Sequence, residues 1–409
     1  MVTAGVYLLI RSQSFFILIP NLLIALTFIG SLTAFFAAST GLTQNDLKKI
    51  IAYSTCSQLG YMFLACGNGQ FSISFFHLIN HAFFKALLFL AAGCVIHAWN
   101  GRQDIRYMGH AINFLPFTYS SFLIGSLALM GFPFLTGFYS KDLIIETAFG
   151  SYLISSYFSF WLALFTAFLT AFYSTRLLYY TFVSSPFSPS DRPTPTTPAA
   201  SNGASLSLMS LPLFILSFFS IFFGYLAKDL FVGIGTPIFS APHNFDSEFL
   251  DPLVRLYPNI FSACGLLCAL FVYTNRNYSV FQFTPNFLTS LYWFINGKWF
   301  FDTLNAILSD SFLLFSYLIP FKSLDRGFIE LVGPTGLSKF SGEYWLSASL
   351  NYQTGLVSDL TFGILSVTTA MLILLFNSYE ILPGLFLSSF KIISLIAISF
   401  LLWLPKSIN

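Results

Sequence analysis

Apolar runs long enough to cross a lipid bilayer recur along almost the whole chain. A membrane-spanning helix needs about 20 apolar residues, because the hydrocarbon core is about 30 Å thick and each helical residue advances about 1.5 Å. With 56% hydrophobic and 8% charged residues, the chain is far less polar than soluble domains, which are about 25% charged. The runs occupy residues 15–39, 50–66, 72–98, 115–130, 153–183, 206–226, 257–274, 360–376 and 382–404. We therefore expect an all-α, polytopic membrane helix bundle with about eight to ten membrane segments.

The order of these runs predicts five parts. Residues 184–205 are rich in Pro, Ser and Thr and should form an exposed linker after a transmembrane bundle at 1–183. Additional transmembrane helices follow at 206–298. In residues 299–345, charged side chains recur among Phe, Leu and Ile, a pattern that favours a long amphipathic helix lying along the membrane surface. Residues 346–409 should then provide a C-terminal transmembrane anchor.

Charge and cysteine content narrow the class of partner. The formal net charge is only +2, so no basic surface for nucleic acid is indicated, and partners should lie in the membrane. The five cysteines form no CxxC pair and lie mostly in apolar runs, where a thiol behaves as a small hydrophobic group. We interpret them as structural.

Three ionisable residues share one face of one apolar run. In FHLINHAFFKALLF, His77, His81 and Lys85 follow i, i+4, i+8 spacing, which aligns them along one helical stripe. Ionisable groups at this depth face the protein interior or a water-filled cavity and often mark proton paths. The alternatives are a structural histidine or a lysine that reaches the membrane surface, but Lys85 is too central to reach it. A metal site is not expected, because HLINH lacks the glutamate of HExxH and no third ligand is near.

A second candidate site follows an interruption in another run. The segment GFPFLTGFYSKD places Gly131, Pro133 and Gly137 in an apolar stretch, which predicts a broken helix, and transporters bind ions at such breaks. Lys141 and Asp142 follow at once, so we select Lys141 as a candidate proton carrier and Asp142 as its support. The alternative is an ordinary loop in which Lys141 is interfacial.

Three long blocks resemble a known family. They are QNDLKKIIAYSTCSQLGYM, FHLINHAFFKALLFLAAG and SLALMGFPFLTGFYSKD, and they are similar, in the same order, to subunit 5 of mitochondrial NADH:ubiquinone oxidoreductase (respiratory complex I). That subunit belongs to the Mrp-type antiporter-like family. The resemblance is dense over residues 1–182, and over residues 206–376 it rests mainly on layout.

The resemblance implies a fold and roles for the candidate residues. Family members contain two inverted repeats of five helices, each with a broken helix, and the chain matches the second repeat and the C-terminal arm. Lys85 would be the central lysine of the second half-channel, His77 and His81 its connecting histidines, and Lys141 the terminal lysine on the exit side. The family's first-half glutamate, lysine and histidine have no counterpart. We therefore expect a separately encoded N-terminal fragment, unless the sequence is truncated.

The resemblance also implies a function. The chain would be a proton-translocating membrane-arm subunit that couples NADH oxidation by ubiquinone to proton pumping, an enzyme only as part of the complex, in the mitochondrial inner membrane. It has no GxGxxG motif, P-loop or iron–sulfur cysteine pattern, so NADH, FMN, iron–sulfur clusters and ubiquinone would be bound by partner subunits. Those partners would be other membrane-arm subunits, especially neighbouring antiporter-like ones, the N-terminal fragment and lipid. Two alternatives remain: an Mrp-type cation/proton antiporter subunit and a non-conducting structural anchor.

Overall fold

The structure is a computed structural model that describes residues 2–99, 101–185, 203–232, 249–274, 285–352 and 355–378. These residues are almost entirely helical and divide into two compact units, Met1–Thr303 and Leu304–Asn409. Within the described part, six helices are long and apolar enough to span a membrane, so the all-α, multi-pass class predicted from the sequence is confirmed. Most of the expected linker, residues 186–202, and the expected last span, 382–404, lie outside the described residues.

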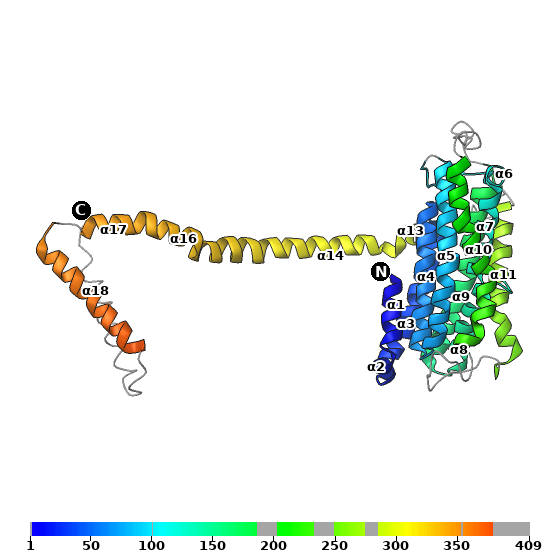
Figure 1. The fold of residues 1–409 in the computed structure, drawn as a ribbon, viewed down its shortest axis with the longest axis horizontal. Helices are drawn as coiled ribbons and strands as arrows, with labels where there is room; N and C mark the ends of the chain where they lie inside the picture. The colour runs from blue at the N-terminus through cyan, green and yellow to red at the C-terminus, as the bar shows by residue number, and fades with distance from the viewer. Residues whose placement is uncertain are drawn as a thin grey trace. The chain divides into compact units, whose positions relative to one another are not determined.

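The first unit is a bundle of upright helices (Figure 1). Its apolar sequence runs become helices close to the expected bounds, although the first run is divided. Pro20 begins a new helix there, because proline suits the first helical position and has no N–H to donate to a preceding turn. The helices are α1 (Val2–Arg11), α2 (Gln13–Ile17), α3 (Pro20–Thr43), α4 (Leu47–Gly67), α5 (Phe71–Ala98), α6 (Ala111–Phe114), α7 (Pro116–Met130), α8 (Leu143–Gly150), α9 (Ile154–Leu178), α10 (Gly203–Phe231), α11 (Pro252–Thr274) and α13 (Pro285–Asn296).

Small residues bring α3 and α4 into backbone contact. A Cβ atom added to Gly30 would lie 2.5 Å from the Leu64 nitrogen, and one added to Gly60 would lie 2.6 Å from the Ala34 nitrogen. Membrane helices lack a hydrophobic drive to associate, since lipid is equally apolar, and they use such small residues to gain van der Waals contact. The α3–α4 pair is therefore closely packed along its length.

The ends of several helices are tied together at one end of the bundle, which we call the clamp end and define by residues 42–47, 99–110 and 176–184. Buried Arg176 on α9 donates to the Leu42 carbonyl at 2.5 Å, the Gln44 carbonyl at 2.8 Å and the Asn45 side-chain oxygen at 2.8 Å. These bonds satisfy carbonyls left free where α3 ends.

Backbone pairing closes the clamp end further. The Leu47 N–H donates to the Gln103 carbonyl, and the Ile105 N–H donates to the Asn45 carbonyl, both at 2.9 Å. At the surface, Arg106 forms an ion pair with Asp104 at 2.6 Å. Partial burial acts to raise the pKa of Asp104, but the hydrogen bonds from Arg106 outweigh it and lower this pKa below its usual value.

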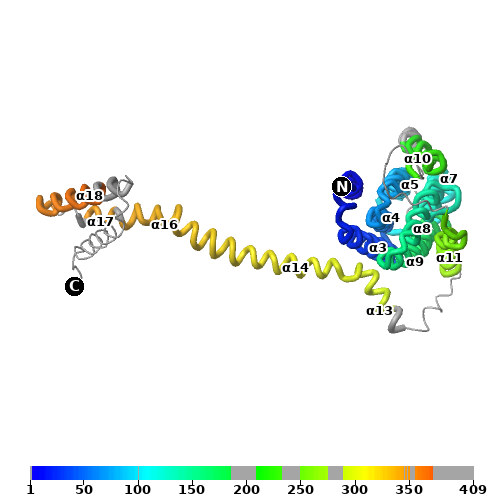
Figure 2. The backbone as a smooth tube through the Cα atoms, turned by 90° about the horizontal axis from the view of Figure 1, so that it is seen from below, coloured from blue at the N-terminus to red at the C-terminus, as the bar shows by residue number. Residues whose placement is uncertain are grey.

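Two further helices cover the outside of the bundle. The end-on view shows α10 beside α5 and α11 beside α9 (Figure 2). Phe83 on α5 stacks on Phe219 of α10, with ring centres 5.1 Å apart, and a Cβ on Gly265 of α11 would meet the Phe168 carbonyl at 2.3 Å. The interior between α4, α5, α7, α8 and α9 is thereby shielded on both sides.

A bend joins α13 to the next helix. Lys298, Trp299 and Phe300 all have positive φ angles, at 55°, 55° and 56°. Residues other than glycine rarely adopt positive φ angles, so three such residues in succession need support from packing. Trp299 provides it, because its ring packs edge-on against Phe36 of α3 at 5.3 Å and stacks on Phe294 at 5.4 Å.

The second unit contains a nearly continuous helical run from Leu304 to Tyr352, drawn in yellow and orange in Figure 1. None of its residues from Leu304 to Tyr344 is buried, and by composition alone this part is apolar enough to cross a membrane. Its length fits the predicted surface helix better than a single membrane crossing, because the 47 residues from Lys298 to Tyr344 would extend about 70 Å, more than twice the bilayer core. The run comprises α14 (Phe301–Ser316), η6 (Tyr317–Ile329), α15 (Glu330–Val332), α16 (Pro334–Lys339), η7 (Phe340–Tyr344) and α17 (Trp345–Tyr352), and α18 (Val357–Ser378) follows.

Candidate functional site

The three ionisable residues of α5 all lie inside the bundle. His77 is 0% exposed, and His81 and Lys85 are each 4% exposed, although their helix is apolar enough to span the membrane. Lys85 is near the middle of the 28-residue helix, about 20 Å from either end at the helical rise. It therefore cannot place its ammonium group at the membrane surface.

His77 has a hydrogen-bonding partner on each ring nitrogen. Its Nδ1 is 2.9 Å from the Ser140 hydroxyl, and its Nε2 is 3.1 Å from the Gln58 side-chain oxygen. With this orientation of the amide, neutral His77 donates from Nε2 to Gln58 and accepts from Ser140 at Nδ1. Protonated His77 would donate from both nitrogens, and Ser140 could then donate to the Thr136 carbonyl, which is 3.3 Å away. Both protonation states fit the same surroundings.

His81 lies between His77 and Lys85 but is bonded to neither in the part of the chain that the structure describes. Its ring centre is 6.4 Å from that of His77, and its buried Nε2 has no partner among the described residues. The neighbouring Asn80 donates to the Thr136 carbonyl at 3.4 Å, while its own Oδ1 has no described partner. Buried polar atoms of this kind are typically satisfied by ordered water.

Lys85 is held by the next helix. Its ammonium group donates to the Ser54 hydroxyl of α4, and Ser54 donates in turn to the Ile51 carbonyl at 2.8 Å. Ser54 and Gln58, the partners of Lys85 and His77, are one turn apart on α4. One face of α4 therefore supplies partners to the ionisable face of α5.

The predicted helix break is present between Met130 and Phe138. Gly131 ends α7 with a φ of +87°, a conformation that suits glycine. A Cβ on Gly137 would lie only 1.7 Å from the Ala128 carbonyl oxygen, so the returning chain can pass α7 only without a side chain there. The helix restarts through the wide turns of η2 (Phe138–Asp142), which contain Ser140, Lys141 and Asp142.

Lys141 points at the broken end of α7. Its Nζ donates to the Met130 carbonyl at 3.2 Å and the Thr170 hydroxyl at 3.0 Å, and it lies 5.6 Å from the centre of the Tyr61 ring. Free carbonyls at a helix C-terminus carry partial negative charge and attract a cation. The lysine is 1% exposed. It is therefore a buried cation site and not the interfacial residue of the alternative interpretation.

Asp142 is buried beside Lys141, with its Oδ2 unpartnered among the described residues. One turn later, Glu146 is also buried and interacts electrostatically with Asp142. Our sequence analysis missed Glu146, although its i, i+4 spacing from Asp142 was visible.

The break and α5 form one connected site. Ser140 contacts His77, and the adjacent Lys141 contacts α7 and α9, so the five residues selected from the sequence lie in one buried interior region. Sequence reasoning did not find the polar partners Ser54, Gln58, Ser140 and Thr170. Gln58 could have been found, because a polar amide within an apolar run, like an ionisable group there, is expected to face the protein interior. No group of three metal-ligating side chains occurs among the residues described.

Comparison with known proteins supports a single family. The model described as NADH:quinone oxidoreductase/Mrp antiporter, TM matches residues 1–170, and the model described as NADH dehydrogenase subunit 5 C-terminus matches residues 173–377, about half of the chain. Together they cover the bundle and much of the second unit.

Curated relatives agree with these models. NADH-ubiquinone oxidoreductase chain 5 of Marchantia polymorpha is 50% identical over 356 residues, which are 83% of this chain and 51% of the relative. The proteins of the same name from Cryptococcus neoformans and Acanthamoeba castellanii are each 45% identical and cover 92% and 93% of this chain, and 57% and 58% of the relatives. The chain thus spans about half the length of the curated relatives it matches.

A solved structure supports the fold. A chain of the Mrp complex from a Dietzia species aligns with a TM-score of 0.54 over 93% of this chain and 37% of that chain, at 20% identity. Identity this low supports the fold alone. On the two family models and these relatives, the chain belongs to the antiporter-like family of NADH:quinone oxidoreductase and Mrp antiporter subunits, in its NADH dehydrogenase subunit 5 branch.

Proposed function

We propose that the chain is a proton-translocating part of the membrane arm of respiratory complex I in the mitochondrial inner membrane. The observation that carries this proposal is the buried array itself: Lys85 and His77 lie inside a helix that is long and apolar enough to span a membrane, Lys141 lies at the helix break, and all three are bonded to hydroxyl, amide or carbonyl groups. Burying ionisable groups at this depth is costly, so such an array is expected only where protons or ions move.

The array suggests how protons pass. Lys85 and Lys141 each hold or release one proton, and His77 and His81 relay it between them. Bound water molecules bridge the gaps between side chains that do not contact each other. Ser140 can donate to neutral His77 or accept from protonated His77, so the histidine can change state without moving its neighbours. Asp142 and Glu146 would help to balance charge at Lys141.

The driving force would come from partner subunits. Moving one charge against the membrane potential requires about 2.3 kcal/mol per 100 mV, and nothing in this chain's sequence supplies it. We propose that NADH, FMN, iron–sulfur clusters and ubiquinone are bound by those partners, among which neighbouring antiporter-like subunits would contact this chain. The portion of the relatives that this chain does not match would carry the remaining part of the relay, as a separately encoded N-terminal fragment or as further sequence.

Replacing Lys85 by methionine tests the relay. Lys85→Met keeps the length of the side chain but removes the proton carrier, so NADH-driven pumping in the assembled complex should fall on the order of a hundredfold, the usual cost of losing a proton-transfer group. Lys49→Met is a matched control, because Lys49 is 58% exposed and forms an ion pair with Asp46 at the N-terminal end of α4. Normal pumping by correctly assembled Lys85→Met would remove Lys85 from the path.

A cation/proton antiporter subunit is the second candidate, because the solved Mrp chain shares the fold. The two functions differ in their driving force. In sealed membrane vesicles, NADH should acidify the interior if the complex I proposal holds, whereas a sodium gradient alone should do so for an antiporter.

A further inference from the structure

The segment that joins the two parts of the broken helix is attached to the bundle at Thr136. Between Met130 and Phe138 the chain reaches the surface, where Phe132 and Phe134 are 50% and 76% exposed. Thr136 is 0% exposed, and its side chain and backbone are both bonded to other helices. The position of this segment therefore depends on what Thr136 contacts.

The first of these contacts is with α10. The Thr136 hydroxyl donates to the Ser220 carbonyl of α10 at 2.9 Å, and Ser220 is also fully buried. One turn further along α10, a Cβ atom added to Gly224 would lie 2.6 Å from the Thr136 Cα atom. Hydrogen bonds between helices and close approach at small residues are the interactions that hold helices together in a membrane. We call this contact the α10 brace and define it by Thr136, Ser220 and Gly224.

The same helix packs against α5, which carries the histidines. Phe219 of α10 stacks on Phe83 of α5 with ring centres 5.1 Å apart, and Phe231 stacks on Phe76 at 5.8 Å. Phe76 directly precedes His77 in the sequence. The end-on view shows α10 on the outer side of the bundle, beside α5 and α7 (Figure 2). One helix therefore supports both α5 and the break.

The backbone carbonyl of Thr136 connects the α10 brace to the candidate site. It accepts from the Asn80 side chain of α5 at 3.4 Å and lies 3.3 Å from the Ser140 hydroxyl. Ser140 in turn contacts Nδ1 of His77 at 2.9 Å. A displacement of Thr136 would therefore move a partner of Asn80 and would alter the surroundings of the hydroxyl that His77 needs.

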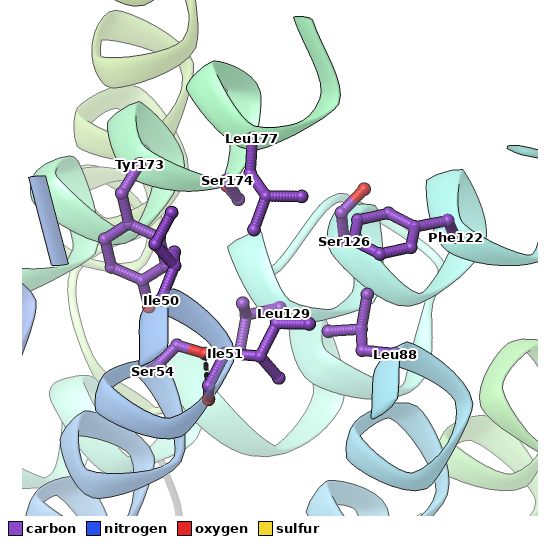
Figure 3. A pocket seen from close by; sticks show the side chains of 10 residues that line it. All are labelled: Ile50, Ile51, Ser54, Leu88, Phe122, Ser126, Leu129, Tyr173, Ser174 and Leu177. Atoms are coloured by element: carbon purple, nitrogen blue, oxygen red, sulfur yellow. Dashed lines mark hydrogen bonds between the residues drawn. The ribbon is translucent and has the colours of Figure 1, made fainter. Parts of the chain in front are cut away.

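The last turn of α7, just before the break, is packed differently. Leu129 lines a small cavity whose walls are mostly hydrocarbon, together with Ile51 of α4, Leu88 of α5 and Phe122 of α7 (Figure 3). Single van der Waals contacts are weak and depend little on direction, whereas a hydrogen bond requires a defined distance and angle. The bond from Thr136 to α10 therefore fixes the break more narrowly than this packing does.

We propose that the α10 brace fixes the broken helix and that Thr136 is a positioning residue, which keeps Ser140 within hydrogen-bonding distance of His77. Its importance for proton transfer rests on the proposed function. The family models match the break within residues 1–170 and α10 within residues 173–377. The brace is thus a contact through which the C-terminal part of the chain sets the geometry of the candidate site.

The structural half of the proposal is tested by cryo-EM of the native assembly that contains this chain. Thr136→Val keeps the branched side chain and removes the hydroxyl, so we expect the contact between Ser140 and His77 to lengthen beyond hydrogen-bonding distance. Thr118→Val is the matched control, because the buried Thr118 hydroxyl donates to a carbonyl one turn earlier, at 2.9 Å. An unchanged contact in Thr136→Val would overturn the proposal, whether or not the assembly pumps protons.

The positioning role is tested by NADH-driven pumping per assembled complex. Thr136→Val should pump roughly tenfold more slowly than Thr118→Val, the loss expected when one buried hydrogen bond no longer holds the site. Thr136→Ser keeps the hydroxyl and should recover most of the rate. Equal rates in Thr136→Val and Thr118→Val, or no recovery in Thr136→Ser, would contradict the proposal. Absence of pumping in the unaltered assembly would instead refute the proposed function.

A second variant disturbs the α10 brace from the side of α10. Gly224→Ala places a Cβ atom against the Thr136 backbone, which must then shift, whereas Gly93→Ala in α5 adds a Cβ atom with nothing within 4 Å. We expect only Gly224→Ala to lengthen the contact between Ser140 and His77 and to slow pumping, by roughly tenfold or more. An assembled Gly224→Ala with normal pumping would contradict the proposal. Thr136→Val adds no bulk and decides the matter even if Gly224→Ala prevents assembly.

Discussion

His77 is bonded so that it can carry a proton and also lose it. Its two ring nitrogens contact Ser140 and Gln58, and Ser140 has a second acceptor in the Thr136 carbonyl. A hydroxyl group can turn between donating and accepting, which an amide N–H cannot do. At the scale of single residues, Ser140 is therefore the group that would let His77 change its charge in the proposed relay.

Replacing Ser140 tests this role. Ser140→Ala removes the acceptor for Nδ1–H of protonated His77, and an unsatisfied buried donor costs about 1 to 3 kcal/mol. Proton pumping should therefore slow by roughly tenfold or more while assembly is retained, as measured by NADH-driven acidification of vesicles. Ser140→Thr retains a hydroxyl and should recover much of the rate. A rate in Ser140→Ala equal to that of the unaltered protein would show that His77 does not need this partner.

The broken helix is the element that brings the site together. The gap between α7 and α8 exposes the Leu129 and Met130 carbonyls to Lys141 and directs Ser140 toward α5. Gly137 makes this possible because the chain passes directly against the Ala128 carbonyl. A continuous helix would use those carbonyls in its own hydrogen bonds and leave the lysine without partners.

Gly137→Ala should therefore prevent folding of the break. The new Cβ atom would overlap the Ala128 oxygen, and relief of that overlap should cost more than about 3 kcal/mol. Gly93→Ala in α5 is the control, since nothing lies within 4 Å of its added Cβ and alanine favours a helix by about 0.5 to 1 kcal/mol. The yield of monodisperse protein after solubilisation measures the difference, and equal yields would contradict the steric argument.

The elements were predictable and their mutual contacts were not. Apolar runs gave the long helices of the bundle, and Gly131, Pro133 and Gly137 predicted the break. The stripe of His77, His81 and Lys85 followed from helical periodicity. Ser54 and Thr170 could not be found in this way, because serine and threonine are common in membrane helices and only the pairing of two helices shows which ones meet a lysine.

Across the bundle as a whole, the clamp end joins segments that are far apart in sequence. Arg176 of α9 holds the end of α3, and backbone bonds join the start of α4 to the segment after α5. This arrangement could not be read from the sequence, where Arg176 is one arginine near the end of an apolar run. The three positive φ angles at Lys298, Trp299 and Phe300 were equally unpredictable, because packing against α3 and α13 supports them.

Arg176→Lys should lower the stability of the bundle while preserving charge. An ammonium group cannot reproduce the planar, forked donor geometry, so at least one buried acceptor loses its bond, at about 1.5 to 3 kcal/mol. The melting temperature of the solubilised protein should fall accordingly. Arg11→Lys, at the exposed end of α1, should leave it unchanged. Equal melting temperatures for the two variants would show that the clamp contributes little.

The second unit should matter for assembly and not for the relay. None of the residues of its helical run from Leu304 to Tyr344 is buried, and the run extends beyond the thickness of a bilayer, so neighbouring subunits are the expected cover. Deleting residues 304–345 should therefore reduce the amount of assembled membrane arm on native gels. A complete membrane arm formed without this segment would refute its role in holding subunits together.

The close contact of α3 and α4 restricts where motion can occur. Glycines 30 and 60 bring the two backbones so near that neither helix can rotate or slide alone without a clash. Ser54 and Gln58, which bind Lys85 and His77, therefore lie on a rigid pair of helices, α3 and α4. Any conformational cycle that makes and breaks the bonds to Lys85 and His77 must then move α5 or the α7–α8 break against that pair. The α3–α4 pair should therefore stay fixed while α5 or the break moves, and spectroscopic labels placed across the break should report such motion.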